Sequence, residues 1–317
     1  MSILVRAPNW LGDAVMATPF LRRLTARFPS EPLDVVAKPS VAAVFRGMPG
    51  IRRVLPLGAP EASARALRRE GYDIAYILPT SFSSAWGAFL AGATERVGHA
   101  SEGRSWLLTW AVPLDERYHY TRRYLGLIGE EDREASRENL FFPVENPPFP
   151  LPEGPILALA PGSRAPARRW MPERFAEVVR RLPASWKSVI LLGAAQDEPF
   201  AQAVARSAGR PTLNLCGKTS LPILGGILKR CRALVANESG LMHAAWAVGT
   251  PLVAVAGPSE PRCTSPFGPK VRVLIHREVP CVPCVKNECF RMGADHQACL
   301  KAVSTDEVLS ALSEVAP

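Results

Sequence analysis

The residues of this sequence best suited to chemistry lie between two apolar runs, in the segment Asn237-Glu238-Ser239-Gly240 and at His243. A helix is predicted to begin at Ser239-Gly240 and to end at Gly249, because glycine commonly terminates helices. The first N–H groups of a helix lack partners within it and attract anions, and a glycine lets a phosphate approach the backbone closely. The pattern therefore predicts a diphosphate site at the start of this helix.

Two further side chains of this segment suit a nucleotide ligand. Glu238 precedes the helix and can accept hydrogen bonds from a ribose diol, while His243 lies one helical turn further on. A plainer interpretation makes Ser239 a helix cap and His243 a surface histidine, and short motifs of this kind often match by chance. The elements around the segment have to decide between the two interpretations.

Other nucleotide-binding and hydrolase motifs are missing from the sequence. Gly217-Lys218-Thr219 looks like the end of a P-loop, but Thr212 stands where the first glycine of that loop is required. No G-x-G-x-x-G follows the first predicted strand, and neither G-x-S-x-G nor H-E-x-x-H occurs. Nothing suggests a carboxylate-bound catalytic magnesium. What is left is an anion site built from a helix N-terminus and from arginines.

Four of the seven cysteines are clustered, namely Cys281, Cys284, Cys289 and Cys299. In a cytosolic protein, clustered thiols indicate metal or redox chemistry before structural disulfides. Four thiolates can close a tetrahedral zinc site, and His296 can replace one of them. The spacing is not that of a standard zinc ribbon, so reduced thiols or an occasional disulfide stay open as alternatives. In every case we expect a local structural staple and not the catalyst.

The first half of the chain alternates strand and helix patterns. Apolar strands are predicted from Ile3 to Val5 and from Leu33 to Ala37. The helix between them contains Pro19, which marks a kink or the first turns of a helix. Asp13 lies at the start of this helix, where a carboxylate is also a favourable cap. The pattern is the opening of a parallel α/β sheet.

The second half repeats the alternation, from a strand at Ile156 to Ala160 to a last helix that a capping box at Ser304 and Glu307 begins. A proline-rich run from Pro147 to Pro152 reads as a linker. We therefore expect an α/β protein with two Rossmann-like domains, residues 1–150 and 151–317, with the last helix able to pack back on the first domain. Ligands bind at the carboxyl ends of such strands, so two parallel sheets facing each other across a cleft are predicted.

The composition bounds the class of protein. The chain has 317 residues, which suits two domains, and its 47% hydrophobic content is typical of a folded soluble protein. A net charge of +9 implies an anionic partner, but no nucleic-acid-binding module is recognisable and no nucleic acid is expected. No apolar run is long enough to span a bilayer, and the N-terminus lacks a signal-peptide layout, which predicts a cytoplasmic protein.

Four motifs in order along nearly the whole chain resemble those of one known family. They are PNWLGDAVMATPFLRRL, PGSRAPARRWMPERFAEV, ANESGLMHAAWAVGTPLVAVAGPSEP and CVPCVKNECF followed by CL. The combination is similar to the lipopolysaccharide heptosyltransferases of glycosyltransferase family 9, above all to the heptosyltransferase II group. The resemblance implies a GT-B fold, with the acceptor held by the N-terminal domain and the donor nucleotide-sugar by the C-terminal domain.

The resemblance also implies the reaction and its residues. Heptose is transferred from ADP-L-glycero-D-manno-heptose to the inner core of lipopolysaccharide, with inversion at the sugar carbon and without a metal cofactor. Asp13 matches the catalytic base of the family, on an acceptor-side loop with Asn9 and Gly12. The donor-binding positions fall on Ser163, Arg168, Glu238, Ser239, Gly240 and His243. Arg168 and Glu238 replace the more common lysine and aspartate of the family.

The implied partners are ADP-heptose, a lipid-linked phosphorylated oligosaccharide acceptor, and the anionic cytoplasmic face of the inner membrane, where the enzyme is expected to bind peripherally. Two alternatives stay open. One is a family relative that moves another sugar from a nucleotide donor to a different glycan. The other is a basic binding protein without catalysis, whose properties would not depend on Asp13.

Overall fold

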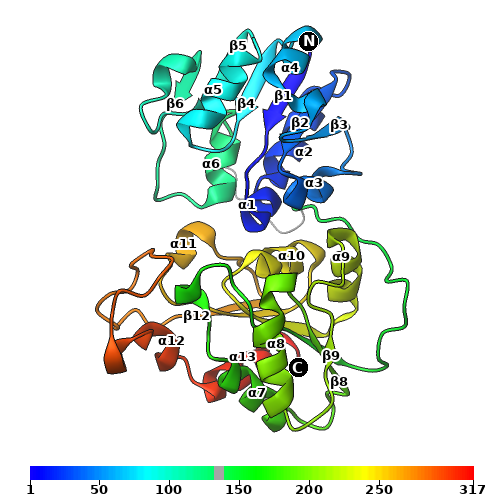
Figure 1. Cartoon of the computed structure of the whole chain (residues 1–317), viewed down its shortest axis with the longest axis vertical. Coiled ribbons are helices and arrows are strands. Elements are labelled where there is room, and N and C mark those ends of the chain that lie inside the picture. The colour runs from blue at the N-terminus through cyan, green and yellow to red at the C-terminus, as the bar shows by residue number, and fades with distance from the viewer. Residues whose placement is uncertain (132–138) are drawn as a thin grey trace. The chain divides into compact units, whose positions relative to one another are not determined.

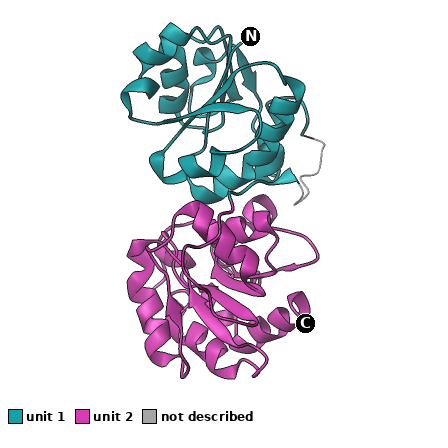
Figure 2. Cartoon of the chain, turned by 90° about the vertical axis from the view of Figure 1, so that its right-hand side faces the viewer, with its two compact units in different colours: residues 1–143 teal, residues 144–317 magenta. Residues whose placement is uncertain are grey.

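The chain forms two compact units, residues 1–143 (unit 1) and 144–317 (unit 2), which Figure 2 shows in different colours. The computed structural model describes residues 1–131 and 139–317. Within these residues, no helix has both the length and the apolar character needed to cross a membrane. The units meet in sequence at Pro143 and Val144, a few residues before the proline-rich run.

Unit 1 is built on a six-stranded parallel sheet with the order β3-β2-β1-β4-β5-β6 (Figure 1). Its strands are β1 (Ile3–Arg6), β2 (Leu33–Ala37), β3 (Ile51–Pro56), β4 (Ile74–Ile77), β5 (Glu95–His99) and β6 (Trp110–Val112). Its helices are α1 (Leu11–Met16), α2 (Thr18–Arg27), α3 (Pro39–Phe45), α4 (Ala64–Glu70), α5 (Phe82–Leu90) and α6 (Tyr120–Gly126), with short 3₁₀ turns η1 (Pro60–Ala62) and η2 (Ser105–Leu107).

Unit 2 repeats this design with the order β12-β11-β10-β7-β8-β9, again parallel. Its strands are β7 (Ile156–Ala160), β8 (Ser188–Leu191), β9 (Leu213–Asn214), β10 (Ala233–Asn237), β11 (Leu252–Val255) and β12 (Val271–Leu274). Its helices are α7 (Pro172–Arg181), α8 (Glu198–Ser207), α9 (Leu221–Arg230), α10 (Gly240–Val248), α11 (Pro261–Thr264), α12 (Ala298–Ala302) and α13 (Thr305–Val315), and the turn η4 is Pro166–Arg168.

Both sheets have a point at which the strand order reverses. In unit 1 it lies between β1 and β4, which pair in parallel, and in unit 2 between β7 and β10. Loops that leave two such strands run to opposite faces of the sheet and leave a crevice at its carboxyl edge, where α/β proteins bind ligands. The loop with Asp13 follows β1, and the loops with Arg168 and Glu238 follow β7 and β10, so topology brings the predicted site residues to these two points.

The α/β class and most elements agree with the sequence prediction. Strands β2 and β7 have the expected bounds, and α13 begins with the expected capping box of Ser304 and Glu307. Pro19 lies in the first turn of α2, which is separated from α1 at Ala17, so the single helix predicted there is two helices. Helices α5 and α6 and strand β12 were not predicted, since their composition shows no clear period.

The last helix packs against the core of unit 2. Helix α13 contacts α7 and the strands β10, β11 and β12. Its apolar residues Val308, Leu312 and Val315 are buried in the same core as Trp170 and Phe175. The reason is burial: the face that the amphipathic pattern offers is already covered by the sheet of its own unit.

The segment after Pro143 is attached to unit 2 by backbone contact. The N–H of Glu145 donates to the carbonyl of Pro222 at 2.9 Å. The carbonyl of Glu145 lies so close to Gly226 of α9 that a Cβ there would stand 1.8 Å from its oxygen. Gly226 is therefore required by the close approach of two backbones, although glycine weakens a helix.

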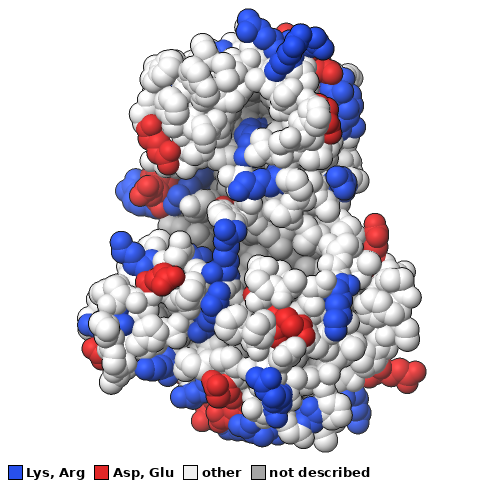
Figure 3. All heavy atoms as spheres, viewed as in Figure 1, with Lys and Arg blue, Asp and Glu red and all other residues white. Residues whose placement is uncertain are grey.

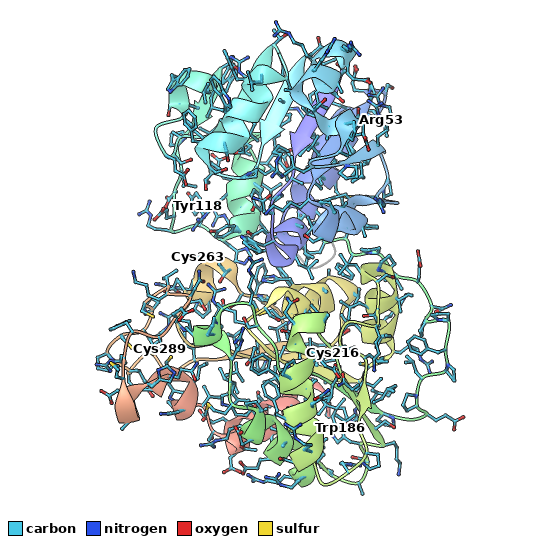
Figure 4. All side chains as sticks on the ribbon, in the orientation of Figure 1. Arg53, Tyr118, Trp186, Cys216, Cys263 and Cys289 are labelled. Atoms are coloured by element: carbon cyan, nitrogen blue, oxygen red, sulfur yellow. The ribbon has the colours of Figure 1, made fainter. Side chains whose placement is uncertain are left out.

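A buried carboxylate stabilises the outer strands of unit 1. Asp34 of β2 is fully buried and accepts hydrogen bonds from Arg52, Arg53 and the Tyr72 hydroxyl, the last at 2.6 Å. Arg53, labelled in Figure 4, also forms an ion pair with Glu70 of α4 at 2.9 Å. Burial by itself raises the pKa of Asp34, but the hydrogen bonds from Arg52, Arg53 and Tyr72 outweigh it and lower that pKa to about 2.

We predict that Asp34→Asn destabilises the protein by about 3 kcal/mol, because it leaves two arginines without their buried partner. The stability that Asp34 contributes is present above pH 4, near the ordinary pKa of aspartate, and is lost as the pH falls toward 2. Denaturant unfolding at pH 7 and pH 3 measures both effects. Asp115→Asn, which removes an exposed ion pair with Arg117, is the control and should change stability little. Equal losses for the two variants would contradict the role of Asp34.

Candidate active site

One fully buried side chain, Asn237, joins the two loops at the order reversal of unit 2. Its Nδ2 donates to the carbonyl of Pro161 at 2.6 Å, and its Oδ1 accepts from the N–H of Trp170 at 2.9 Å. Trp170 is itself buried, and its Nε1 donates to the carbonyl of Val303 at 3.2 Å. The loop after β7, which carries Ser163 and Arg168, is therefore fixed against the end of β10.

Glu238, the next residue, is buried with an incomplete set of hydrogen bonds. Its side chain is 2% exposed, and Oε1 accepts from the Thr264 hydroxyl of α11 at 3.2 Å. Its Oε2 is buried without a partner among the described residues. Burial raises the pKa of Glu238, and the nearby charge of Arg168 and the bond from Thr264 lower it only in part. A buried acceptor of this kind is ready for a hydroxyl donor from a ligand.

Ser239 and Gly240 begin α10 as the sequence predicted. Ser239 occupies the N-cap position with extended backbone, but its hydroxyl does not cap the helix and has no partner in the described part of the chain. Its Oγ and the first N–H groups of α10 therefore remain available to an anion. His243 lies one turn into α10 and is buried, not on the surface as the plainer interpretation held.

Arg168 and Ser163 complete this group of residues. The Ser163 hydroxyl donates to the carbonyl of Glu238 at 3.3 Å, so it fixes the turn between β10 and α10. Arg168 ends η4, and its Nε is buried with no acceptor among the residues that the structure describes. Its charge reaches Glu238, whose pKa it lowers. Unit 2 thus gathers an unpaired guanidinium nitrogen, a helix N-terminus and a buried carboxylate at one edge.

In unit 1 the structure places Asp13 in the first turn of α1, at the carboxyl edge of the sheet. Asn9 precedes this helix, and its Oδ1 accepts from Arg6 Nη2 at 2.6 Å, which fixes the loop after β1. Gly12 lies within α1 and is half-buried. Helix α6 packs against α1, and the charge of Asp13 contributes to the raised pKa of the buried Tyr124, after burial itself. The charge of Asp13 therefore acts on a buried tyrosine that the sequence did not single out.

The four clustered cysteines line one pocket, together with Phe290 and Gln297 among others. Cys289, labelled in Figure 4, lies between β12 and α12 and accepts from the N–H of Gln297 at 3.3 Å. All seven cysteines, each in the described part of the chain, are free thiols. Burial raises the pKa of Cys299, and the charges of Cys281, Cys284 and Cys289 add to it, so the four sulfurs lie near one another.

The four cysteine sulfurs of this pocket are donors that suit a thiophilic metal, but they are not arranged around a common centre. No three His, Cys, Asp or Glu side chains within residues 1–131 and 139–317 are spaced so that they could hold a metal ion. His296 instead directs Nδ1 toward the carbonyl of Arg291 at 3.1 Å. The pocket lies beside the loop after β7, because Ala167 both lines it and donates its N–H to the carbonyl of Asn287.

Lysine and arginine side chains are scattered over both units on the face drawn in Figure 3. The net charge of +9 is therefore not confined to one domain of the chain. Two cations of the chain lie in the segments after β2 and β7: Lys38, which stacks over the Trp10 ring at 5.5 Å, and Arg168 of η4. Both follow carboxyl ends of strands, where an anionic ligand is expected.

The chain is similar along most of its length to known transferases. The model of glycosyltransferase family 9 (heptosyltransferase) matches residues 61–294. Lipopolysaccharide heptosyltransferase 2 of Escherichia coli K12 is 32% identical over 305 residues, which cover 86% of this chain and 88% of the relative. The chain belongs to glycosyltransferase family 9.

Other relatives of the family agree. Lipooligosaccharide heptosyltransferase 2 of Haemophilus influenzae is 30% identical over 99% of both chains. The structure of E. coli ADP-heptose lipopolysaccharide heptosyltransferase II superposes with a TM-score of 0.78 and 29% identity, over 99% of this chain and 98% of that chain. The family that the four motifs indicated is confirmed, as are the α/β GT-B class of the fold and the assignment of this protein as a glycosyltransferase.

Sequence reasoning assigned no role to three polar residues of the edge in unit 2. Asn237 joins the loops, Thr264 binds Glu238, and Ser259 is buried with an unpartnered hydroxyl in the described structure. All three stand within or just beyond the quoted motif that ends in GPSEP. The available signal was Asn237, a polar residue at the end of an apolar strand. This signal points to a functional site only once the topology is known to place β10 at the order reversal.

We predict that Glu238→Gln stabilises the ligand-free protein by about 1 kcal/mol at pH 8, because an incompletely bonded buried carboxylate is removed. Since the folded state has the higher pKa, the cost of ionising Glu238 is absent near pH 4 and grows as the pH rises above the ordinary glutamate value. Thermal unfolding at pH 5 and pH 8 measures the difference between the variant and the native protein. A variant that is less stable at pH 8, or whose advantage does not grow with pH, would contradict this assignment.

Proposed function

We propose that this protein transfers L-glycero-D-manno-heptose from ADP-heptose to the inner core of lipopolysaccharide, with inversion at the sugar carbon. The observation that supports the donor site is the group at the order reversal of unit 2, where Glu238 Oε2, Ser239 Oγ and Arg168 Nε are buried without partners in the described structure. The name of the E. coli heptosyltransferase II structure supports ADP-heptose as the donor.

In the proposed reaction, the acceptor hydroxyl oxygen attacks the anomeric carbon of heptose. A new C–O bond forms there while the bond to the diphosphate oxygen breaks, and ADP leaves with the electron pair. Asp13 takes the proton of the attacking hydroxyl as general base, for which it must be ionised and within hydrogen-bond reach. Single displacement from the face opposite the leaving group inverts the configuration at that carbon.

The leaving diphosphate is stabilised by fixed charges and dipoles of unit 2. Arg168 neutralises it through charge-assisted hydrogen bonds, and the first N–H groups of α10, with Ser239 and Gly240, bind its oxygens. Glu238 accepts from the ribose hydroxyls, His243 contributes to the donor site from the first turns of α10, and Ser163 fixes the turn between β10 and α10. Because these groups supply the positive potential, no metal cofactor is required for catalysis.

The acceptor of this proposal is a lipid-linked, phosphorylated oligosaccharide. The loop of unit 1 with Asn9, Gly12 and Asp13 binds it, and the enzyme works in the cytoplasm in peripheral contact with the anionic face of the inner membrane. The net charge of +9 is favourable for that contact.

We predict that ADP binds in the presence of EDTA and that UDP and GDP bind at least about tenfold more weakly. Isothermal titration calorimetry of the whole chain measures this directly. A preference for UDP or GDP would keep the fold and mechanism but assign a different sugar donor. Binding of none of the three would favour a basic binding protein without catalysis.

We predict that Asp13→Asn lowers heptose transfer by at least about a hundredfold, the usual contribution of a general base, while the affinity for ADP stays unchanged. The control is Asp73→Asn, since Asp73 accepts from the N–H of Ser2 near the amino end of β4, away from the ligand edge. Transfer is followed by release of ADP from ADP-heptose with a core acceptor. Full turnover by the Asp13 variant would contradict the role of Asp13 as the general base.

We also propose that the pocket of Cys281, Cys284, Cys289 and Cys299 holds a structural zinc ion. Four thiols lining one pocket are the donor type that zinc prefers, but within the described residues no three of them are spaced for an ion, so binding would have to draw the thiolates together. The bound ion would then fix the segment between β12 and α12 beside the loop with Arg168. We predict about one zinc per purified chain by elemental analysis. Cys284→Ser should lose the metal and lower the melting temperature, whereas Cys263→Ser on α11 should keep it. Metal-free protein of full stability would contradict the proposal.

A further inference from the structure

An unusual number of large apolar side chains is exposed on one side of unit 1. Trp106 is 66% exposed, and four residues of α5 are about two-fifths exposed each. We call this surface the aromatic face. It consists of Phe82, Trp86, Phe89, Leu90 and Trp106. Soluble proteins expose such residues singly, so a contiguous group indicates a binding surface.

The rings of the aromatic face contact one another and form a continuous layer. Trp86 lies at the centre, with ring centroids 6.4 Å from Phe82, 5.6 Å from Phe89 and 6.4 Å from Trp106. Phe82 and Trp106 are also in ring contact at 6.2 Å. Helix α5 and the turn η2 thus present their aromatic residues together.

Arginines border this layer. The guanidinium of Arg96 lies 5.5 Å above the Phe89 ring, and the side chain of Arg68 runs beside Gly92, just after α5. Helix α4, which packs against α5, exposes Arg65, Arg68 and Arg69. Of the nearby carboxylates, Glu70 pairs with Arg53, and Glu102 lies at the end of the face, where it accepts from the N–H of Phe82 at 3.1 Å.

This combination matches the chemistry of a bilayer interface. Tryptophan rings favour the headgroup level, where the ring is sheltered and its N–H is wet, and arginines beside them bind lipid phosphates. The positive charge of these exposed arginines is complementary to an anionic lipid surface, whereas a second copy of the chain would bring like charges together. Aromatic rings with exposed arginines at their border therefore favour an anionic lipid surface over a second copy of the chain.

The aromatic face begins at the ligand edge of unit 1. Helix α5 follows β4, and α1 with Asp13 follows β1, its parallel neighbour at the order reversal. Trp10, half exposed under Lys38, lies in the loop that leads into α1. If the aromatic face lies on lipid, the carboxyl edge of unit 1, where the acceptor is proposed to bind, is therefore next to the lipid surface.

We propose that the aromatic face docks unit 1 on an anionic bilayer, with its rings at headgroup level and the arginines of α4 on lipid phosphates. The docking presents the edge with Asp13 to substrates anchored in the membrane. This docking surface deepens the proposed function, which includes peripheral contact with an anionic membrane, and the membrane-anchored acceptor rests on that same proposed function.

The first test is sedimentation of the full chain with vesicles of phosphatidylethanolamine and phosphatidylglycerol, compared with pure phosphatidylcholine. Trp86→Gln combined with Trp106→Gln should lower the partition coefficient at least tenfold. Arg65→Gln combined with Arg68→Gln should remove only the preference for phosphatidylglycerol, and high salt should abolish that preference in the native chain. Met292→Gln, an exposed apolar residue of unit 2, is the matched control and should bind like the native chain.

A second readout locates the contact. Brominated lipids should quench tryptophan fluorescence of the native chain and quench it far less in the double tryptophan variant. Unchanged ADP binding and melting temperature show that this variant is folded. Native chain that ignores anionic vesicles, or a tryptophan variant that binds them fully, overturns the proposal. A concentration-dependent dimer that the tryptophan variant abolishes would assign the face to a second copy.

Transfer assays separate this proposal from the proposed function. The tryptophan variant should keep native kcat/KM with a water-soluble, deacylated acceptor and lose at least tenfold with the same acceptor in vesicles. Equal losses with both acceptors overturn the docking role. If the native chain glycosylates neither acceptor, the proposed function fails, and vesicle binding still decides the docking surface.

Discussion

The buried amide of Asn237 is the interaction on which the candidate active site depends. It spans the point where the strand order of unit 2 reverses, and its two hydrogen bonds tie the loop after β7 to the end of β10. A buried amide left without partners costs about 1–3 kcal/mol, so the two loops cannot separate without penalty. Trp170, whose N–H is bound by the same amide, is buried in the core of unit 2 and fixes the position of Arg168, two residues before it. The site residues are thereby held rigidly against the sheet.

Several polar atoms without hydrogen-bond partners lie near Asn237 at the order reversal of unit 2. Glu238, Ser239, Arg168 and Ser259 each keep a buried atom without a partner in the described structure, whereas Asp34 of unit 1 is bonded on every side. The contrast separates two uses of buried charge. Asp34 joins strands and a helix by completing its own hydrogen bonds. The residues at the edge of unit 2 leave bonds open at a cost in stability, as expected where a polar ligand supplies the missing partners.

The two units share a topology and differ in chemistry. Both sheets reverse their strand order between the first and fourth strands, so both offer a crevice at the same edge. In unit 2 this edge has a glycine-started helix, an arginine and a carboxylate. In unit 1 it has Asp13, a tyrosine on α6 and an aromatic helix. A repeated scaffold with different side chains at one edge is how a single fold can hold two unlike substrates.

The sequence by itself determined the parallel α/β class, the strands of both sheets near the site, and the helix starting at Gly240, because these depend on local apolar runs, glycines and caps. Four ordered motifs also determined the family. The tertiary structure alone decided that Asn237 joins two loops, that His243 is buried, that α13 packs on its own unit, and that five apolar residues of α5 and η2 form one exposed face. These facts depend on which strands become neighbours, and no local pattern encodes a contact between residues far apart in the chain.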